Sequence, residues 1–493
     1  MKHRLTASLI LFLFSLTPED SAAQTTALTR KDTAIRSYDG REMKGELLRL
    51  TVPERHLRPA RTLTVGALRF PTTAAKPGRP IVFLMGGPGI PGSVMAPIPP
   101  YFTLFQKLRD IGDVIIVDQR GIGLSSPHID CPSSGSLPTT VFADTARLIS
   151  FIRDQISICV ARQRSRNIEP TAYNTIESAE DVNALRTALG ITKIDLLAFS
   201  YGTRLALLTA QRHEASVGRM VLQGVNGPGL VVKRPAPVAR KLSRVTEILR
   251  LDSAWTPAPD LIDAARRARL RLASNPSTVT VNDQKTGKPV ALKVGREGFD
   301  AIVALNMDDM RLPALLVSVA NGDDRVLTRF VESAWNGLNT SPVQLMARSV
   351  NCAADRPASR WALAAAESAA APFGSPIDNA FLTKRFCIAI GYPGTVKEFS
   401  RSLRSPIPTL LITGALDATN PAENARDVAA GLTSSTLLEA GNVAHEALPV
   451  AAVQDVILEF LRGADVRSRQ VAGPRPHYLT IREALSPPPR RGP

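Results

Sequence analysis

The sequence predicts an α/β fold, a mostly parallel sheet with flanking helices. Short apolar runs at 79–85 (RPIVFLM) and 113–117 (DVIIV) alternate with segments of helical character. Such runs are typical of strands buried on both faces, and their alternation with helices is typical of a parallel sheet. A long and mainly helical segment, 230–399, precedes the last two predicted strands at 408–414 and 435–440. The sequence therefore predicts a sheet whose last two strands follow a large inserted helical cap.

The start of the chain has the features of a secretory signal peptide. Lys2 and Arg4 precede an apolar stretch at 5–16, and small residues at 21–23 offer a cleavage site after Ala23. The apolar stretch is too short to cross a bilayer as a helix. We therefore expect residues 1–23 to be removed, and the mature protein to be periplasmic or secreted, with no transmembrane segment.

The first part of the core is predicted to span residues 24–229. Besides the two buried strands above, strands are expected at 45–52, 61–70, 194–199 and 219–225. An amphipathic helix at 178–189 is followed by Gly190, a residue that commonly ends helices because it adopts the left-handed conformation without strain. This helix leads directly into the strand 194–199.

That strand leads to the first candidate catalytic residue. The stretch 194–207 (IDLLAFSYGTRLAL) places Ser200 between a buried strand and a run of helix formers. In so tight a turn the residues two before and two after the serine nearly touch, and here they are the small residues Ala198 and Gly202. This is the G-x-S-x-G pattern of a nucleophile elbow with alanine in its first position. The pattern predicts Ser200 as a nucleophile.

A serine nucleophile needs a base and a carboxylate that orients the base. Of six histidines, His445 lies just beyond a predicted strand of the second core segment, 400–466, and Asp417 lies three residues beyond the strand 408–414. The carboxyl ends of parallel strands carry the functional loops of such sheets. The chain order Ser200, Asp417, His445 is the order of an α/β-hydrolase triad.

Stabilisation of an oxyanion requires two backbone N–H groups. We expect one from Tyr201, directly after the nucleophile, and one from Gly87 in the glycine-rich turn after the strand 79–85. The same turn contains a G-x-G-x-x-G pattern, but Pro88 and Pro91 interrupt the helix start that a dinucleotide site needs. The sequence thus gives no reason to expect a cofactor.

The chain contains four cysteines, Cys131, Cys159, Cys352 and Cys387. In an oxidising compartment an even number indicates disulfides, and three connectivities are open. We favour the two local pairs, Cys131 with Cys159 and Cys352 with Cys387. No C-x-x-C pair supports the alternative, a zinc site.

The chain is strongly basic, with a formal net charge of +16. Its arginines are scattered and accompany no nucleic-acid-binding motif, so we expect no nucleic acid partner. The last residues, 467–493, are rich in Pro and Arg and are predicted to form a flexible basic tail.

Three motifs together resemble one family. They are Gly86-Gly87-Pro88-Gly89, the stretch 118–125 (DQRGIGLS) and Ser200-Tyr201-Gly202. They are similar to those of the proline iminopeptidase and tripeptidyl aminopeptidase family of α/β-hydrolases, over residues 45–225 and 400–465. The resemblance implies an α/β-hydrolase fold and a serine exopeptidase that releases residues or short peptides from free N-termini through an acyl-enzyme, without metal or cofactor.

The chain departs from this family at Met85, where proline iminopeptidases have His, and at Ala198 and Thr203, where Gly is common. None of these departures removes a catalytic group.

The resemblance also implies acidic cap side chains that hold the substrate's ammonium group. Asp355 and Glu332 are the candidates, with Asp323 as a third. The expected partner is a peptide or a small acyl substrate. Two alternatives stay open: a carboxylesterase with the same triad, and a non-catalytic envelope-binding protein on the same fold.

Overall fold

A computed structural model describes residues 27–58, 60–394 and 403–486. The signal peptide predicted at 1–23 lies outside the described residues. No helix within the described residues is both long enough and apolar enough to span a lipid bilayer.

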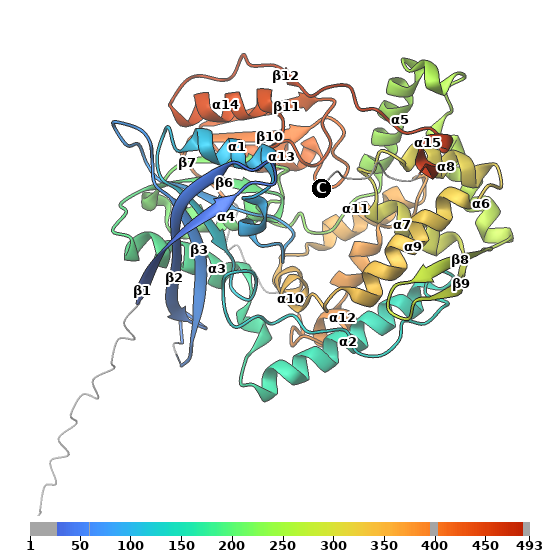
Figure 1. Ribbon diagram of the computed structural model, residues 1–493, viewed down its shortest axis with the longest axis horizontal. Helices are drawn as coiled ribbons and strands as arrows, with labels where there is room; N and C mark the ends of the chain where they lie inside the picture. Colours follow the sequence, from blue (N-terminus) through green and yellow to red (C-terminus); the bar gives the residue numbers. More distant parts are fainter. Residues whose placement is uncertain (1–26, 59, 395–402, 487–493) are drawn as a thin grey trace, which may run out of the picture.

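A ten-stranded sheet forms the centre of the core, in the order β1-β2-β3-β5-β4-β6-β7-β10-β11-β12 (Figure 1). Pairing is antiparallel from β1 to β5 and parallel from β5 to β12. The strands span β1 Leu28–Arg36, β2 Glu42–Pro53, β3 Thr62–Phe70, β4 Ile81–Leu84, β5 Val114–Asp118, β6 Ile194–Phe199, β7 Val217–Gln223, β10 Thr409–Gly414, β11 Ser435–Gly441 and β12 Val471–Ala472. The mostly parallel sheet predicted from the apolar runs is confirmed.

Helices cover both faces of the sheet. On β4, Val82 and Leu84 join one hydrophobic cluster, while Ile81 and Phe83 join the cluster of the opposite face. This alternation explains why every residue of β4, β5, β6 and β10 is buried and why their sequences are mostly apolar. The first cluster includes residues of α3 (Thr175–Ala188), α4 (Tyr201–Arg212) and α13 (Ala422–Ala429), and the second includes residues of α1 (Pro99–Leu108) and α14 (Ala451–Leu461).

The cap lies beside the sheet and has a hydrophobic core of its own (Figure 1). Its elements are α5 Ala236–Arg250, α6 Leu261–Ser274, β8 Ser277–Asp283, β9 Lys288–Val294, α7 Arg296–Leu305, α8 Leu312–Ala320, α9 Arg325–Thr340, α10 Leu345–Ala353, α11 Ala358–Ser368 and α12 Lys384–Ile388. Phe142 and Leu148 also belong to the cap's core, although they precede the elbow in sequence. Leu148 lies on α2 (Thr145–Ser165), which runs along the edge of the cap.

The prediction of a flexible basic tail at 467–493 is wrong for residues 467–486. Here β12 pairs with β11, and the segment then crosses to the cap, where α15 (Ile481–Leu485) packs against α8 and α9 (Figure 1). Tyr478 is buried in the cap's core, and its carbonyl oxygen accepts a hydrogen bond from Trp255 Nε1 at 3.0 Å. A few apolar residues among the prolines and arginines thus provide enough burial to order the segment. Residues 487–493 lie outside the described residues.

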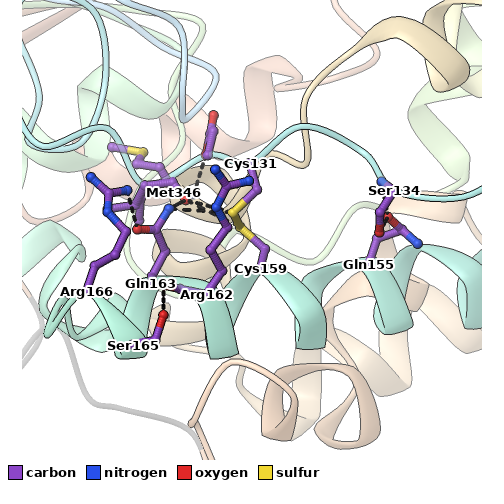
Figure 2. Close-up of a disulfide and its surroundings, with 11 residues drawn as sticks. Cys131, Ser134, Gln155, Cys159, Arg162, Gln163, Ser165, Arg166 and Met346 are labelled. Atoms are coloured by element: carbon purple, nitrogen blue, oxygen red, sulfur yellow. Dashed lines mark hydrogen bonds between the residues drawn. A yellow bond between two sulfur atoms is a disulfide. The ribbon is translucent and has the colours of Figure 1, made fainter.

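Both predicted disulfides are confirmed, Cys131–Cys159 and Cys352–Cys387. The first links the loop after residue 128 to α2 (Figure 2). Close by, Gln155 Oε1 accepts hydrogen bonds from the backbone N–H and the hydroxyl of Ser134, at 2.7 and 3.0 Å. The loop is therefore held to α2 at two points.

A buried ion pair links the motif at 118–125 to α3. Arg120 is fully buried, and its guanidinium donates to both carboxylate oxygens of Asp181 at 2.7 and 2.6 Å. His56 Nε2 lies 2.9 Å from the same carboxylate. Burial by itself would raise the pKa of Asp181, but the charge of Arg120 and the hydrogen bonds from His56 and Arg120 hold it below its ordinary value.

Replacing Asp181 with asparagine is expected to lower the free energy of unfolding by about 3–5 kcal/mol, because it leaves the buried charge of Arg120 uncompensated. Urea denaturation measures this loss. In the wild type, the Asp181 carboxylate contributes to the free energy of unfolding above about pH 4, the ordinary aspartate range. This contribution is lost as the pH falls through the lower pKa that Asp181 has in the folded protein. Asp154→Asn, at an exposed pair with Arg153, is the control and should cost ~1 kcal/mol or less.

Candidate active site

Ser200 occupies a sharp turn between β6 and α4. Its backbone has φ 54° and ψ −121°, a conformation that costs free energy in a residue other than glycine. The turn is held by the Ser200 N–H, which donates to the Gln223 carbonyl on the neighbouring strand β7 at 2.8 Å. The side chain lies at the carboxyl end of the strand, and Ser200 is 8% exposed. This is the local geometry that the small-x-Ser-x-Gly pattern predicts.

Close packing explains the small residue two positions after the serine. A Cβ on Gly202 would lie 2.0 Å from the carbonyl oxygen of Leu84 on β4. Gly202→Ala is therefore expected to lower the free energy of unfolding by about 1–3 kcal/mol and to reduce activity, because the first turn of α4 must move away from β4. Urea denaturation and ester turnover measure the two effects. Gly337→Ala is the matched control, because its Cβ would meet no atom within 4 Å.

A continuous chain of hydrogen bonds links Ser200 to two residues far along the sequence. Ser200 Oγ lies 3.0 Å from His445 Nε2, and His445 Nδ1 lies 2.8 Å from Asp417 Oδ2. Asp417 follows β10 and His445 follows β11, so the three side chains meet at one edge of the sheet. Asp417 Oδ1 accepts the backbone N–H groups of Thr419 and Asn420, both at 2.8 Å. The carboxylate is thus fixed in orientation, with one oxygen left for the imidazole.

Further contacts hold His445 from three sides. Gln223 Nε2 donates to its carbonyl oxygen at 2.7 Å, and the ring of Phe199 lies 5.0 Å from the imidazole, centroid to centroid. From the cap, Asp308 accepts the His445 N–H at 3.3 Å and forms an ion pair with Lys241. The cap and the ends of β6 and β7 therefore fix the position of the imidazole.

Lys233 supports the loop that carries Asp417. Its ammonium group is buried and donates to the Thr419 carbonyl at 2.9 Å and to Asn420 Oδ1 at 2.7 Å. Burial lowers its pKa to about 8, against the opposing charges of Asp378 and Asp417. Sequence reasoning missed this residue, because a single lysine at the start of a cap carries no pattern.

The glycine-rich turn after β4 lies directly against Ser200. A Cβ on Gly86 would approach the Ser200 Cβ to 2.6 Å, and Gly87 has a φ of 110°. Tyr201 is the first residue of α4, whose N-terminal end carries a partial positive charge. The turn and the helix start thus border the hydroxyl from two sides, an arrangement able to receive a developing negative charge.

The cap reaches this turn through α10. Ala347 lies against Gly89, since a Cβ at Gly89 would be 3.1 Å from the Ala347 Cβ. One helical turn further, Asn351 Oδ1 accepts from an Arg204 N–H at 3.4 Å. Asp355 comes two residues after the end of this helix.

The other two predicted acidic residues lie elsewhere in the cap. Asp323 forms an ion pair with Arg325 at 2.7 Å on the exposed surface. Glu332 lies on α9, which packs against α8, β8 and α15. The spacing of charged residues in the sequence does not show which cap element covers the site.

A cavity of about 740 Å³ opens next to the turn. Its lining includes Gly89 and Pro91 of the turn, His128 and Asp130 of the disulfide-linked loop, and Thr340 of the cap. Asp130 Oδ1 accepts the Met346 N–H at 2.9 Å, and burial raises the Asp130 pKa.

Known proteins are similar to part of this chain. The chain is similar to the serine protease Hip1 of Mycobacterium tuberculosis (30% identical over 189 residues, 36% of each chain) and to a tripeptidyl aminopeptidase of Streptomyces coelicolor (26% over 191 residues, 36% of this chain and 35% of the relative). The matches span about a third of these relatives' length.

Among solved structures, the proline iminopeptidase of Mycobacterium smegmatis aligns over 84% of this chain and 97% of its own, with 16% identity and a TM-score of 0.36. Residues 79–452 match the alpha/beta hydrolase fold family. This match covers most of the chain, so the protein belongs to the α/β-hydrolase fold family.

Proposed function

We propose that the protein is a serine hydrolase whose catalytic residues are Ser200, His445 and Asp417. The observation that carries this proposal is the hydrogen-bond chain from the Ser200 hydroxyl through the imidazole to the carboxylate, with links of 3.0 and 2.8 Å. Such a chain lets the imidazole remove the serine proton while the carboxylate stabilises the imidazolium that forms.

In the proposed reaction, Ser200 Oγ attacks the substrate carbonyl and His445 Nε2 takes its proton. The backbone N–H groups of Gly87 and Tyr201 bind the oxyanion. His445 then protonates the leaving group, and an acyl-enzyme remains on Ser200. Water then attacks this ester while His445 takes its proton. His445 returns the proton to Ser200, and the free acid leaves.

The proposed substrates are peptides with free N-termini, from which the enzyme releases single residues or short peptides. The likeness to a serine protease and to a tripeptidyl aminopeptidase supports this class. Asp355, which follows α10, is the proposed partner of the substrate ammonium group. The two disulfides support the proposal that the protein acts outside the cytoplasm.

The test compares amide with ester substrates. Purified protein is offered aminoacyl and tripeptidyl nitroanilides, the same nitroanilides with acetylated N-termini, and short-chain nitrophenyl esters. We expect cleavage of the free-amine nitroanilides, loss of that cleavage on acetylation, and no turnover by Ser200→Ala. Turnover of esters without amides would make the protein a carboxylesterase, and equal cleavage of acetylated substrates would exclude the exopeptidase.

A further inference from the structure

A second cavity, of about 350 Å³, lies between α2, α7, α9 and the start of α10. Its volume is within the range of about 300–1,000 Å³ typical of small-molecule sites. The wall is mostly apolar and includes Phe142, Leu148, Phe151, Ile302, Leu338 and Phe381. No residue of the proposed triad lines it.

One cation, Arg348 of α10, lines this apolar wall. Its guanidinium carbon lies 4.1 Å from the ring centroid of Phe381 and 6.0 Å from that of Phe386. Within the described residues Arg348 has no ion-pair partner, and the carboxylate whose charge acts on it, Asp378, also lines the cavity but is exposed. Arg120, by contrast, is neutralised by a carboxylate that it contacts directly.

A guanidinium held on aromatic faces has its N–H donors available to an anion. Transfer of a charge from water to an apolar wall is costly unless it is paired, and burial accordingly lowers the Arg348 pKa. A bound carboxylate would offset this cost with two parallel hydrogen bonds. The rest of such a ligand would have to be apolar to match the wall.

The cavity also adjoins the one beside the oxyanion turn, because Ser133 and Pro342 line both. Ser133 belongs to the loop that the Cys131–Cys159 disulfide and the Ser134–Gln155 hydrogen bonds fix to α2 (Figure 2). Together the two cavities extend from Gly89 to Arg348. Part of their shared wall is the loop that the Cys131–Cys159 disulfide holds to α2.

We propose that this second cavity binds the carboxylate end of an apolar molecule, with Arg348 as the group that pairs with the anion. The carboxylate can come from a free fatty or aromatic acid, or from the C-terminus of a short apolar peptide. The inference does not depend on the proposed hydrolase activity, because it requires no reaction at Ser200.

Titration calorimetry on the full chain tests whether the cavity prefers a ligand with a negative charge. Octanoate is expected to bind at one site, with octanol and octylamine at least about tenfold weaker, as the loss of a charge-assisted pair predicts. Arg348→Gln should abolish the preference for octanoate over octanol, and Arg348→Lys should retain part of it. Equal binding of octanoate and octanol by the wild type, or an unchanged preference in Arg348→Gln, would overturn the proposal.

Gly337 of α9 offers a test of the cavity itself. It lines the space, and a Cβ at this position would meet no atom within 4 Å. Gly337→Leu fills the cavity while replacing a glycine inside a helix by a better helix former, so the fold is expected to persist. We expect it to lower octanoate affinity at least about tenfold, with Gly337→Ala within about threefold of wild type. Octanoate binding that Gly337→Leu leaves unchanged would overturn the site.

The source of the carboxylate is resolved by turnover of short apolar peptides with a free or an amidated C-terminus. If the ligand is a peptide, Arg348→Gln raises KM for the free acid alone and leaves kcat unchanged. If it is a free acid, Arg348→Gln changes KM for neither peptide. Octanoate binding that depends on Arg348, in a protein that turns over no substrate, would remove the proposed function and keep this inference.

Discussion

Replacement of Ser200 with alanine is expected to lower kcat/KM by about 10⁴- to 10⁶-fold, on whichever substrate the wild type turns over fastest. Without the hydroxyl no acyl-enzyme forms, and the remaining rate comes from substrate binding and the oxyanion donors. Initial rates with nitroanilide and nitrophenyl ester substrates measure the loss.

The matched control for this variant is Ser157→Ala. Ser157 is exposed on α2, and its hydroxyl donates only to the Arg153 carbonyl one turn earlier. This variant should keep the wild-type rate, and both variants should unfold at the wild-type urea concentration to within a small shift. A Ser200→Ala enzyme that retains a tenth of the wild-type rate would contradict the proposed nucleophile.

Asp417→Asn is expected to lower kcat by about 10³- to 10⁴-fold, because it changes which nitrogen of the His445 imidazole carries the proton. Because Oδ1 accepts the N–H groups of Thr419 and Asn420, an asparagine keeps its oxygen there and turns its NH₂ toward His445 Nδ1. The proton of the neutral imidazole then moves to Nε2, which can no longer take the proton of Ser200. Single-turnover rates measure this loss.

The double variant Ser200→Ala/Asp417→Asn provides the internal check. Because the residues act as a unit, it should be no slower than Ser200→Ala alone. Asp427→Asn, an exposed position on α13, is the control for the loss of one negative charge and should keep the wild-type rate. A further large loss in the double variant would indicate that Asp417 acts independently of the serine.

The buried strands of the sheet could be predicted because they are covered on both faces. Most of their residues are apolar, as at 196–199 in β6 and 410–412 in β10, and this signal needs no knowledge of tertiary structure. The expected strand positions at 45–52, 61–70 and 194–199 correspond to β2, β3 and β6. By contrast, β1 is an edge strand whose residues are mostly exposed. Its sequence has three charged residues in a row, at 30–32, and carried no clear strand signal.

The C-terminal segment was misjudged for a related reason. Its composition is that of a disordered tail, and the few apolar residues that order it, among them Tyr478, find partners only in the folded cap. Composition describes the chain alone, whereas the burial of these residues depends on surfaces formed by α8 and α9. Terminal segments that complete another element's core are therefore poorly predicted from composition.

At the candidate site, the residues that could be predicted from the sequence are those whose positions follow from the topology of the sheet. Ser200, Asp417 and His445 each follow a strand of one parallel sheet, so their meeting at one edge could be expected before any contact was known. The residues that hold the loops of Asp417 and His445 in place could not be predicted from the sequence. Lys233 and Asp308 come from segments with no strand to place them, and only the folded cap brings them to the loops of Asp417 and His445.

Labelling with a fluorophosphonate, followed by mass spectrometry of the digested protein, tests the central proposal most directly. This reagent reacts with a serine that a neighbouring base activates, and it needs no knowledge of the substrate. We predict one phosphonylated residue, Ser200, and loss of the adduct when His445 is replaced by glutamine. An adduct on another serine, or an unlabelled and fully folded protein, would contradict the account.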